Sequence, residues 1–178
     1  KINIMIFYNN LSIFRFFFKK YILSNIFQLN NKVNFGSKNS NFFFLKELKK
    51  SKFYFEYGSG SSTLVADELN KSYISVELDN VFYNLMYNKI KKKNNIKLSN
   101  IGPVGEYSYP ILKIKSKIIN YVQSIDKYSK NKNFPDLILI DGRFRVACCL
   151  NLLKFKKIIK NKTKIILDDY KNREEYHI

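Results

Sequence analysis

Hydrophobic and polar positions follow two periods that alternate along most of the chain. Between residues 42 and 167, short β-rich apolar runs are followed by longer stretches whose apolar residues lie three and four positions apart. The runs are typical of strands and the longer stretches of amphipathic helices. Because strands that alternate with such helices form parallel sheets covered on both faces, the pattern predicts an α/β protein with a doubly wound, mainly parallel, Rossmann-like sheet.

The predicted elements can be assigned by residue range. Strands are expected over residues 53–57, 73–76, 96–98, 136–141 and 164–167. Helices are expected over residues 42–50, 62–69, 81–91, 111–128 and 146–160. The fourth strand is a continuous apolar run between Pro135 and Gly142, which is typical of a strand that is buried on both faces.

The first 41 residues form a separate region. Apolar positions within residues 11–29 are three and four apart and predict an amphipathic helix, which either docks on the domain or contacts a membrane surface through residues 1–29. Residues 30–41 are polar and aperiodic and predict a connector. The uncharged residues 2–14 are too few and too polar to span a bilayer. The expected domains are therefore 1–41, a helix and connector, and 42–178, a Rossmann-like domain.

The net charge of +18 suggests nucleic-acid binding, but its make-up argues against it. Of the 32 basic residues 28 are Lys, spread over predicted helix faces, whereas surfaces that bind phosphate usually draw on Arg. A non-catalytic protein that binds nucleic acid or a membrane through this Lys-rich surface stays open as an alternative. Cys148 and Cys149 are adjacent and not expected to bridge, so we expect free thiols in a reducing, cytoplasmic compartment.

Candidate chemistry lies at the carboxyl ends of the first two strands, where such sheets bind ligands. A Gly58-Ser59-Gly60 turn follows Glu56 and uses two of the six glycines of the chain. About twenty residues on, Glu77 ends the second strand, and a carboxylate there can accept hydrogen bonds from ribose hydroxyls. The pair predicts a nucleoside-containing cofactor. The third glycine of the dinucleotide fingerprint is absent, which disfavours a pyrophosphate; a plain tight turn is the alternative.

Residues 55–63 and 75–79 resemble motifs I and II of class I S-adenosylmethionine-dependent methyltransferases. Residues 141–148 and 168–176 are similar to a methyltransferase-like branch of the same superfamily. The resemblance implies methyl transfer from S-adenosylmethionine to a small acceptor, with Asp141 beside the sulfonium methyl and the acceptor as the catalytic residue. It further implies that the following residues bind the cofactor: Glu56, Gly58, Ser59, Gly60, Glu77 and, near the adenine, Asn100.

An acidic and basic cluster is predicted at the ends of the last two strands. Asp141, Asp168 and Asp169 could converge there to bind a hard cation such as Mg²⁺. Three of the four arginines fall in the same two blocks, so an anionic acceptor is expected. The predicted acceptor contacts are Arg143, Arg145, Tyr109 and Asp169. A structural network of Arg and Asp side chains is the alternative to both interpretations.

The predicted sheet has fewer strands than the sheet of the family that the sequence resembles. Class I methyltransferase sheets have seven strands, whereas the pattern predicts five here. Residues 175–178 either begin a sixth strand that is cut off or end a reduced fold. With a first residue other than Met, we expect a fragment of a longer protein that lacks the last two strands. The sequence indicates neither the acceptor nor the oligomeric state.

Overall fold

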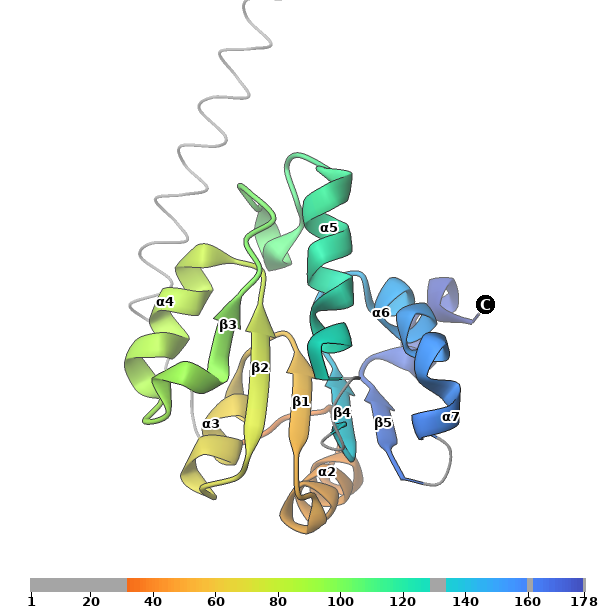
Figure 1. Cartoon of the computed structure of the whole chain (residues 1–178). Coiled ribbons are helices and arrows are strands. Elements are labelled where there is room, and N and C mark those ends of the chain that lie inside the picture. Colours follow the sequence, from red (N-terminus) through yellow and green to blue (C-terminus); the bar gives the residue numbers. More distant parts are fainter. Residues whose placement is uncertain (1–31, 129–133, 160–161, 178) are drawn as a thin grey trace, which may run out of the picture.

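A five-stranded parallel sheet forms the centre of the molecule (Figure 1). The computed structural model describes residues 32–128, 134–159 and 162–177 of the 178-residue chain. The strand order is β3-β2-β1-β4-β5, and the strands are β1 (Tyr54–Tyr57), β2 (Tyr73–Glu77), β3 (Ile96–Leu98), β4 (Leu137–Ile140) and β5 (Lys164–Leu167). This order confirms the predicted doubly wound α/β sheet. The predicted helix over residues 11–29, with its docking or membrane contact, lies outside the described residues.

Helices cover both faces of the sheet. The α-helices are α2 (Lys38–Lys50), α3 (Ser61–Glu68), α4 (Asn80–Lys89), α5 (Lys115–Val122), α6 (Arg145–Leu152) and α7 (Lys156–Ile159). In Figure 1, α5, α6 and α7 lie in front of the sheet, while α2 and α3 lie behind it. All strands run in the same direction, so their carboxyl ends share the upper edge in this view.

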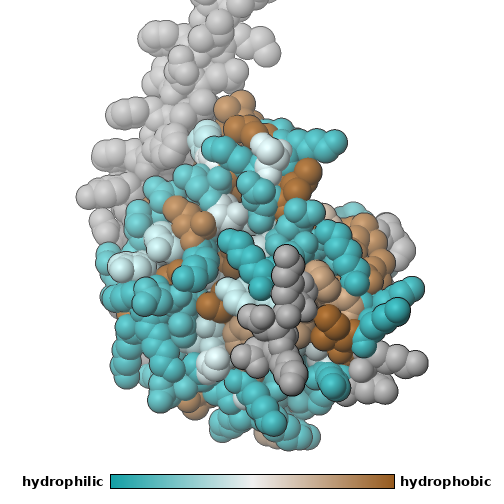
Figure 2. Space-filling model, viewed as in Figure 1, coloured by the Kyte–Doolittle hydropathy of each residue, from teal (hydrophilic) through white to brown (hydrophobic). Residues whose placement is uncertain are grey.

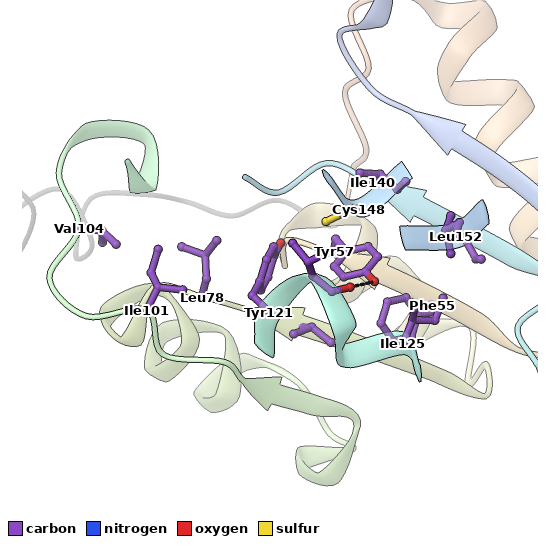
Figure 3. Packing of buried hydrophobic residues seen from close by; sticks show 13 residues of the cluster. Phe55, Tyr57, Leu78, Ile101, Val104, Tyr121, Ile125, Ile140, Cys148 and Leu152 are labelled. Carbon is purple, nitrogen blue, oxygen red and sulfur yellow. Dashed lines mark hydrogen bonds between the residues drawn. The ribbon is translucent and has the colours of Figure 1, made fainter. Parts of the chain in front are cut away.

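The alternation of side chains along β1 divides the core between the two faces. Phe55 and Tyr57 pack against Tyr121 of α5 and Cys148 of α6 (Figure 3). Tyr54, one position away, packs instead with residues of α2 and α3. Every residue of β1 and β4 is buried, because these central strands are covered on both faces, and their burial supplies much of the hydrophobic stabilisation of the fold.

The connector predicted over residues 30–41 is too long: residues 32–37 form neither helix nor strand, whereas residues 38–41 belong to α2. Val33 is buried in the cluster beneath α2, and the helix itself begins at Lys38 rather than at residue 42. Ser37 caps it, since its Oγ accepts a hydrogen bond from the Ser40 amide at 3.0 Å. The first turn of α2 contains only polar residues, so apolar spacing does not indicate where this helix begins.

Two predicted helices are shorter than expected. α5 begins at Lys115 instead of residue 111, because the Ile111 amide donates to Pro103 O at 3.0 Å and closes a hairpin-like loop. The helix predicted over residues 146–160 divides into α6, a 3₁₀ turn and α7. Apolar spacing therefore located both helices but not their ends or their breaks.

The described sheet has five strands, and the end of the chain adds none to it. Residues Glu174–Tyr176 form a 3₁₀ turn, so a sixth strand starting at residue 175 is wrong within the described part of the chain. In the same ranges, no helix combines the length and the apolar character that crossing a membrane would require.

Candidate functional site

The turn after β1 brings two strand ends into contact. Gly58 has φ +88°, a left-handed conformation that favours glycine. A Cβ on Gly58 would lie 2.7 Å from the Cα and N atoms of Gly142, the residue that follows Asp141 after β4. Only glycine allows this approach, so the β1 and β4 turns meet at the carboxyl edge of the sheet.

Glu56 supports the Gly58–Gly60 turn from below. Its buried carboxylate accepts hydrogen bonds from the hydroxyls of Tyr54 at 2.5 Å, Ser62 at 2.7 Å and Thr63. Burial raises the pKa of Glu56, while the hydroxyl donors oppose that shift. No Lys or Arg pairs with Glu56 among the described residues. Its predicted contact with a cofactor stays a prediction, because the carboxylate is engaged beneath the turn.

Glu77 lies at the end of β2 and faces the same turn. Its Oε2 accepts from the Ser59 amide at 3.0 Å and the Ser59 hydroxyl at 2.7 Å, and its Oε1 accepts from the Leu78 and Asp79 amides at 2.9 Å each. A carboxylate offers about four acceptor positions, so all of them are engaged. Burial raises the pKa of Glu77 against these donors. The structure thus brings Glu77 and Ser59 into contact, and their binding of a cofactor stays a prediction.

Asn100 lies just beyond β3, beside the end of β2. Its Oδ1 accepts from the Gly102 amide at 2.8 Å, and the neighbouring Ser99 amide donates to Glu77 O at 2.7 Å. Ser99 and Asn100 also line a groove of about 620 Å³ between β3 and the segment from α5 to residue 127. The predicted adenine contact at Asn100 stays a prediction.

Arg145 joins the ends of β4 and β5. Its buried guanidinium donates to Asp141 Oδ1 at 2.8 Å and to Asp168 O at 2.6 Å, and it lies 3.4 Å from Asp169 Oδ2. It also donates to the Gly142 carbonyl at 3.0 Å. Since its donors are engaged within the protein, these contacts favour the structural network for Arg145 over the predicted acceptor contact.

The predicted metal site is not formed. The structure places no group of three or more Asp, Glu, His or Cys side chains suited to a metal ion within the ranges it describes. Asp141, Asp168 and Asp169 do converge, but around the Arg145 guanidinium, with the nearest oxygen of each within 3.4 Å of it. The positive charge between them takes the place that a cation would need.

Asp141 is the titratable group best suited to proton transfer at this edge. Burial and the neighbouring charge of Asp168 raise the pKa of Asp141 to about 8, while the Arg145 guanidinium opposes the shift. A proton acceptor works best when its pKa lies near the operating pH. Its side chain is 36% exposed, so a ligand can reach it.

Arg143 and Tyr109, both predicted acceptor contacts, lie together. The Arg143 guanidinium stacks over the Tyr109 ring, 4.3 Å from its centroid. Arg143 forms no ion pair with any described residue, in contrast to Arg145. The fourth, Asp169, instead pairs with Arg173 at 3.2 Å. The stack leaves Arg143 as a cation at the edge of the sheet.

The loop that carries Tyr109 spans residues 103–111 and crosses this edge, and we call it the 103–111 loop. Its two sides form a bridge between Val104 and Pro110. Near its tip, Ser108 Oγ donates to Asp79 Oδ2 at 3.2 Å, next to Glu77. The loop thus contacts the ends of both β2 and the β4 turn. Figure 2 shows apolar side chains above α5, where the loop leads into that helix.

Comparison with solved structures identifies the architecture. A methyltransferase-like protein from Silicibacter pomeroyi DSS-3 superposes with a TM-score of 0.61 at 25% sequence identity, over 83% of this chain and 79% of that one. The fold is methyltransferase-like. No family model and no curated protein sequence matches the chain. The fold thus agrees with the resemblance noted in the sequence, whereas the roles of single residues stay predictions.

Several residues at this edge escaped the sequence analysis. Ser62 and Thr63 lie in the run that resembles motif I, but their role as donors to Glu56 depends on the turn geometry. Ser108 gave no signal in a loop of mixed composition. Tyr121 was one of several apolar positions in a predicted helix, although its hydroxyl lies under the two glycine turns.

Proposed function

We propose that this protein transfers a methyl group from S-adenosylmethionine to a small anionic acceptor. The observation that carries the proposal is the contact of Glu77 with the Gly58–Gly60 turn on a methyltransferase-like fold. A buried carboxylate without a cation beside it depends on O–H and N–H donors, and two adjacent ribose hydroxyls are such donors.

The Ser59 hydroxyl is a hydrogen-bond donor to Glu77 that a ligand hydroxyl can replace. Three of the donors on Glu77 are backbone amides fixed by the fold, whereas the fourth is a side-chain hydroxyl that rotates freely about one bond. A ribose hydroxyl can replace it with no change in the number of hydrogen bonds. The carboxylate thereby stays satisfied both without and with a nucleoside.

The chemistry at the other half of the edge follows from Asp141 and Arg143. Bound S-adenosylmethionine supplies an activated methyl group, whose carbon bonds to the acceptor while the sulfur retains the electrons of the broken bond. The ionised form of Asp141, which predominates only above its pKa of about 8, accepts the proton that the acceptor loses, so we expect the rate to rise as the pH approaches that value. Arg143, stacked on Tyr109 and free of carboxylate partners in the described structure, attracts the negative charge of the acceptor.

Calorimetric titration with S-adenosylhomocysteine tests the cofactor assignment. We expect the intact protein to bind it and Glu77→Gln to bind about tenfold or more weakly, because an amide NH₂ replaces one of the two acceptor oxygens and the negative charge that strengthens the hydrogen bond to the ribose is lost. Glu47→Gln is the matched control, since Glu47 pairs with Lys164 at 2.5 Å, away from the carboxyl edge, and should leave the affinity unchanged.

The outcomes separate the claims. An intact protein that does not bind S-adenosylhomocysteine contradicts the proposal and favours the non-catalytic alternative with a Lys-rich binding surface. Normal binding by Glu77→Gln contradicts only the ribose contact. Equal losses in Glu77→Gln and Glu47→Gln point to a general loss of structure, which the thermal unfolding of the two variants reveals.

A further inference from the structure

An exposed patch of apolar and basic side chains extends from the tip of the 103–111 loop to the first turn of α5, and we call it the 107–117 patch. Its large apolar side chains are between 37% and 80% exposed: Tyr107, Tyr109, Ile111, Leu112 and Ile114. Figure 2 shows apolar side chains above α5, where the loop leads into that helix. Single exposed apolar residues are normal on a protein surface, whereas a group of them marks an interaction site.

The backbone of the loop holds its tip in this exposed position. Tyr107 and Ser108 have φ values of +51° and +60°, in the left-handed region that is unfavourable for residues other than glycine. The Gly105 amide donates to Tyr109 O at 2.6 Å, and Ser108 Oγ donates to Asp79 Oδ2 at 3.2 Å. These contacts fix the turn that carries Tyr107, the most exposed large apolar side chain among the described residues.

The charges of the patch are all positive. Between Glu106 and Asp126 the chain has no acidic residue and three basic ones, which are Lys113, Lys115 and Lys117. None of the three forms an ion pair with a described residue. A partner must therefore offer an apolar phase and negative charge in the same place. The surface of an anionic bilayer does so, because acyl chains accept aliphatic side chains, the interface accepts Tyr, and the headgroups attract Lys.

We propose that the 107–117 patch binds the surface of membranes that contain anionic lipids. Leu112 and Tyr107 enter the headgroup region, and the three lysines contact lipid phosphates. A small ligand would need a concave site, whereas the segment projects from the upper end of the domain (Figure 1). The proposal does not depend on methyl transfer, and its residues differ from those of the membrane contact predicted for residues 1–29.

An introduced Trp tests the apolar contact, because the chain contains no Trp of its own. In the full chain, the fluorescence of Leu112→Trp should shift to shorter wavelength when vesicles of phosphatidylcholine and phosphatidylserine are added, since the indole enters a less polar medium. Vesicles of phosphatidylcholine alone should give a smaller shift. Leu153→Trp is the matched control: Leu153 is 63% exposed against 56% for Leu112 but lies in the turn between α6 and α7, so its emission should stay unchanged.

Co-sedimentation with the same mixed vesicles tests the charges. A variant in which Gln replaces the three lysines of the patch should partition about a hundredfold more weakly, because each Lys near an anionic surface contributes about fivefold. The control loses the same net charge from three exposed lysines in and after α7, which are Lys156, Lys157 and Lys162. It should keep most of the affinity of the intact protein.

The other outcomes overturn the proposal. An unchanged emission of Leu112→Trp with the mixed vesicles means that the patch does not enter the bilayer. Equal shifts in the two Trp variants, or equal losses in the two Lys variants, indicate adsorption through the net charge of +18 rather than through this patch. A shift that appears without vesicles as the protein concentration rises assigns the patch to contact with a second copy. The titration with S-adenosylhomocysteine is a separate measurement and bears only on the proposed function.

Discussion

The two halves of the carboxyl edge stabilise negative charge by different means. At the ends of β1 and β2, Glu56 and Glu77 are buried and accept hydrogen bonds only from hydroxyls and backbone amides. At the ends of β4 and β5, Asp141 and Asp168 are partly exposed and share the guanidinium of Arg145. The carboxylates at β1 and β2 are therefore stabilised by neutral donors. Those at β4 and β5 are stabilised by the positive charge of Arg145.

The difference indicates which half can exchange partners with a ligand. A hydroxyl donor can be replaced by another hydroxyl at little cost, whereas removal of a buried guanidinium leaves carboxylates without their counter-ion. The β1–β2 half is therefore suited to bind a nucleoside, and the β4–β5 half to hold Asp141 in place. The largest effect on stability is expected from the charged half.

Arg145→Met should show the energetic difference between the two halves of the edge most clearly. The variant keeps an apolar stem of similar length but removes every donor to Asp141 and Asp168, so we expect it to lose about 3 kcal/mol of unfolding free energy in urea denaturation. Arg173→Met is the control, because its pairs with Asp169 and Glu175 are more exposed and should contribute under about 1 kcal/mol. Similar losses in both variants would show that Arg145 is no more structural than a surface arginine.

A smaller change is expected in the pH dependence of stability. The raised pKa of Asp141, about 8 in the folded protein, means that the native state holds a proton that the unfolded chain releases near pH 4. This contribution is fully present below about pH 4 and is lost as the pH rises toward 8. Asp141→Asn should therefore show a flatter decline of unfolding free energy between those pH values than the intact protein. Parallel curves would contradict the shift.

The smallest effect is expected from Ser59→Ala in the neutral half. The change removes the hydroxyl donor to Glu77 Oε2 and frees one acceptor position for a ribose hydroxyl. We expect a loss of about 1 kcal/mol in unfolding free energy and a gain of less than tenfold in affinity for S-adenosylhomocysteine by calorimetry. Ser51→Ala, which removes a buried hydrogen bond to Leu48 O at 2.8 Å, should lower stability alone. A weaker affinity in Ser59→Ala would show that Ser59 itself contacts the cofactor.

The positions of the strands and the sharp turn after β1 were predictable because they depend on local patterns. The run over residues 136–141 predicted a strand buried on both faces, and residues 137–140 form it, while two glycines after a strand indicated a sharp turn. Glu77 and the Gly58–Gly60 turn could be placed at the same edge because parallel strands end there, but the hydrogen bonds between Glu77 and Ser59 could not.

The partners of Arg145 and Tyr121 were not predictable in the same way. Three aspartates at strand ends are compatible with a metal ion or with an arginine, and only the position of Arg145 on the first turn of α6 decides between them. Tyr121 and Tyr57 have the same side chain on one face of the sheet, yet only Tyr57 finds a carbonyl for its hydroxyl. Such differences depend on the tertiary placement of single atoms, which periodicity does not encode.

The hydroxyl donors to Glu56 also affect the entropy of ligand binding. They link β1 to the first turn of α3, and the Gly60 amide donates to Thr63 Oγ1 at 2.9 Å, so the intervening turn is held at both ends before any ligand arrives. The conformational freedom of the turn is lost when the chain folds and need not be lost again on association. A ligand at the ends of β1 and β2 would therefore meet a preorganised surface.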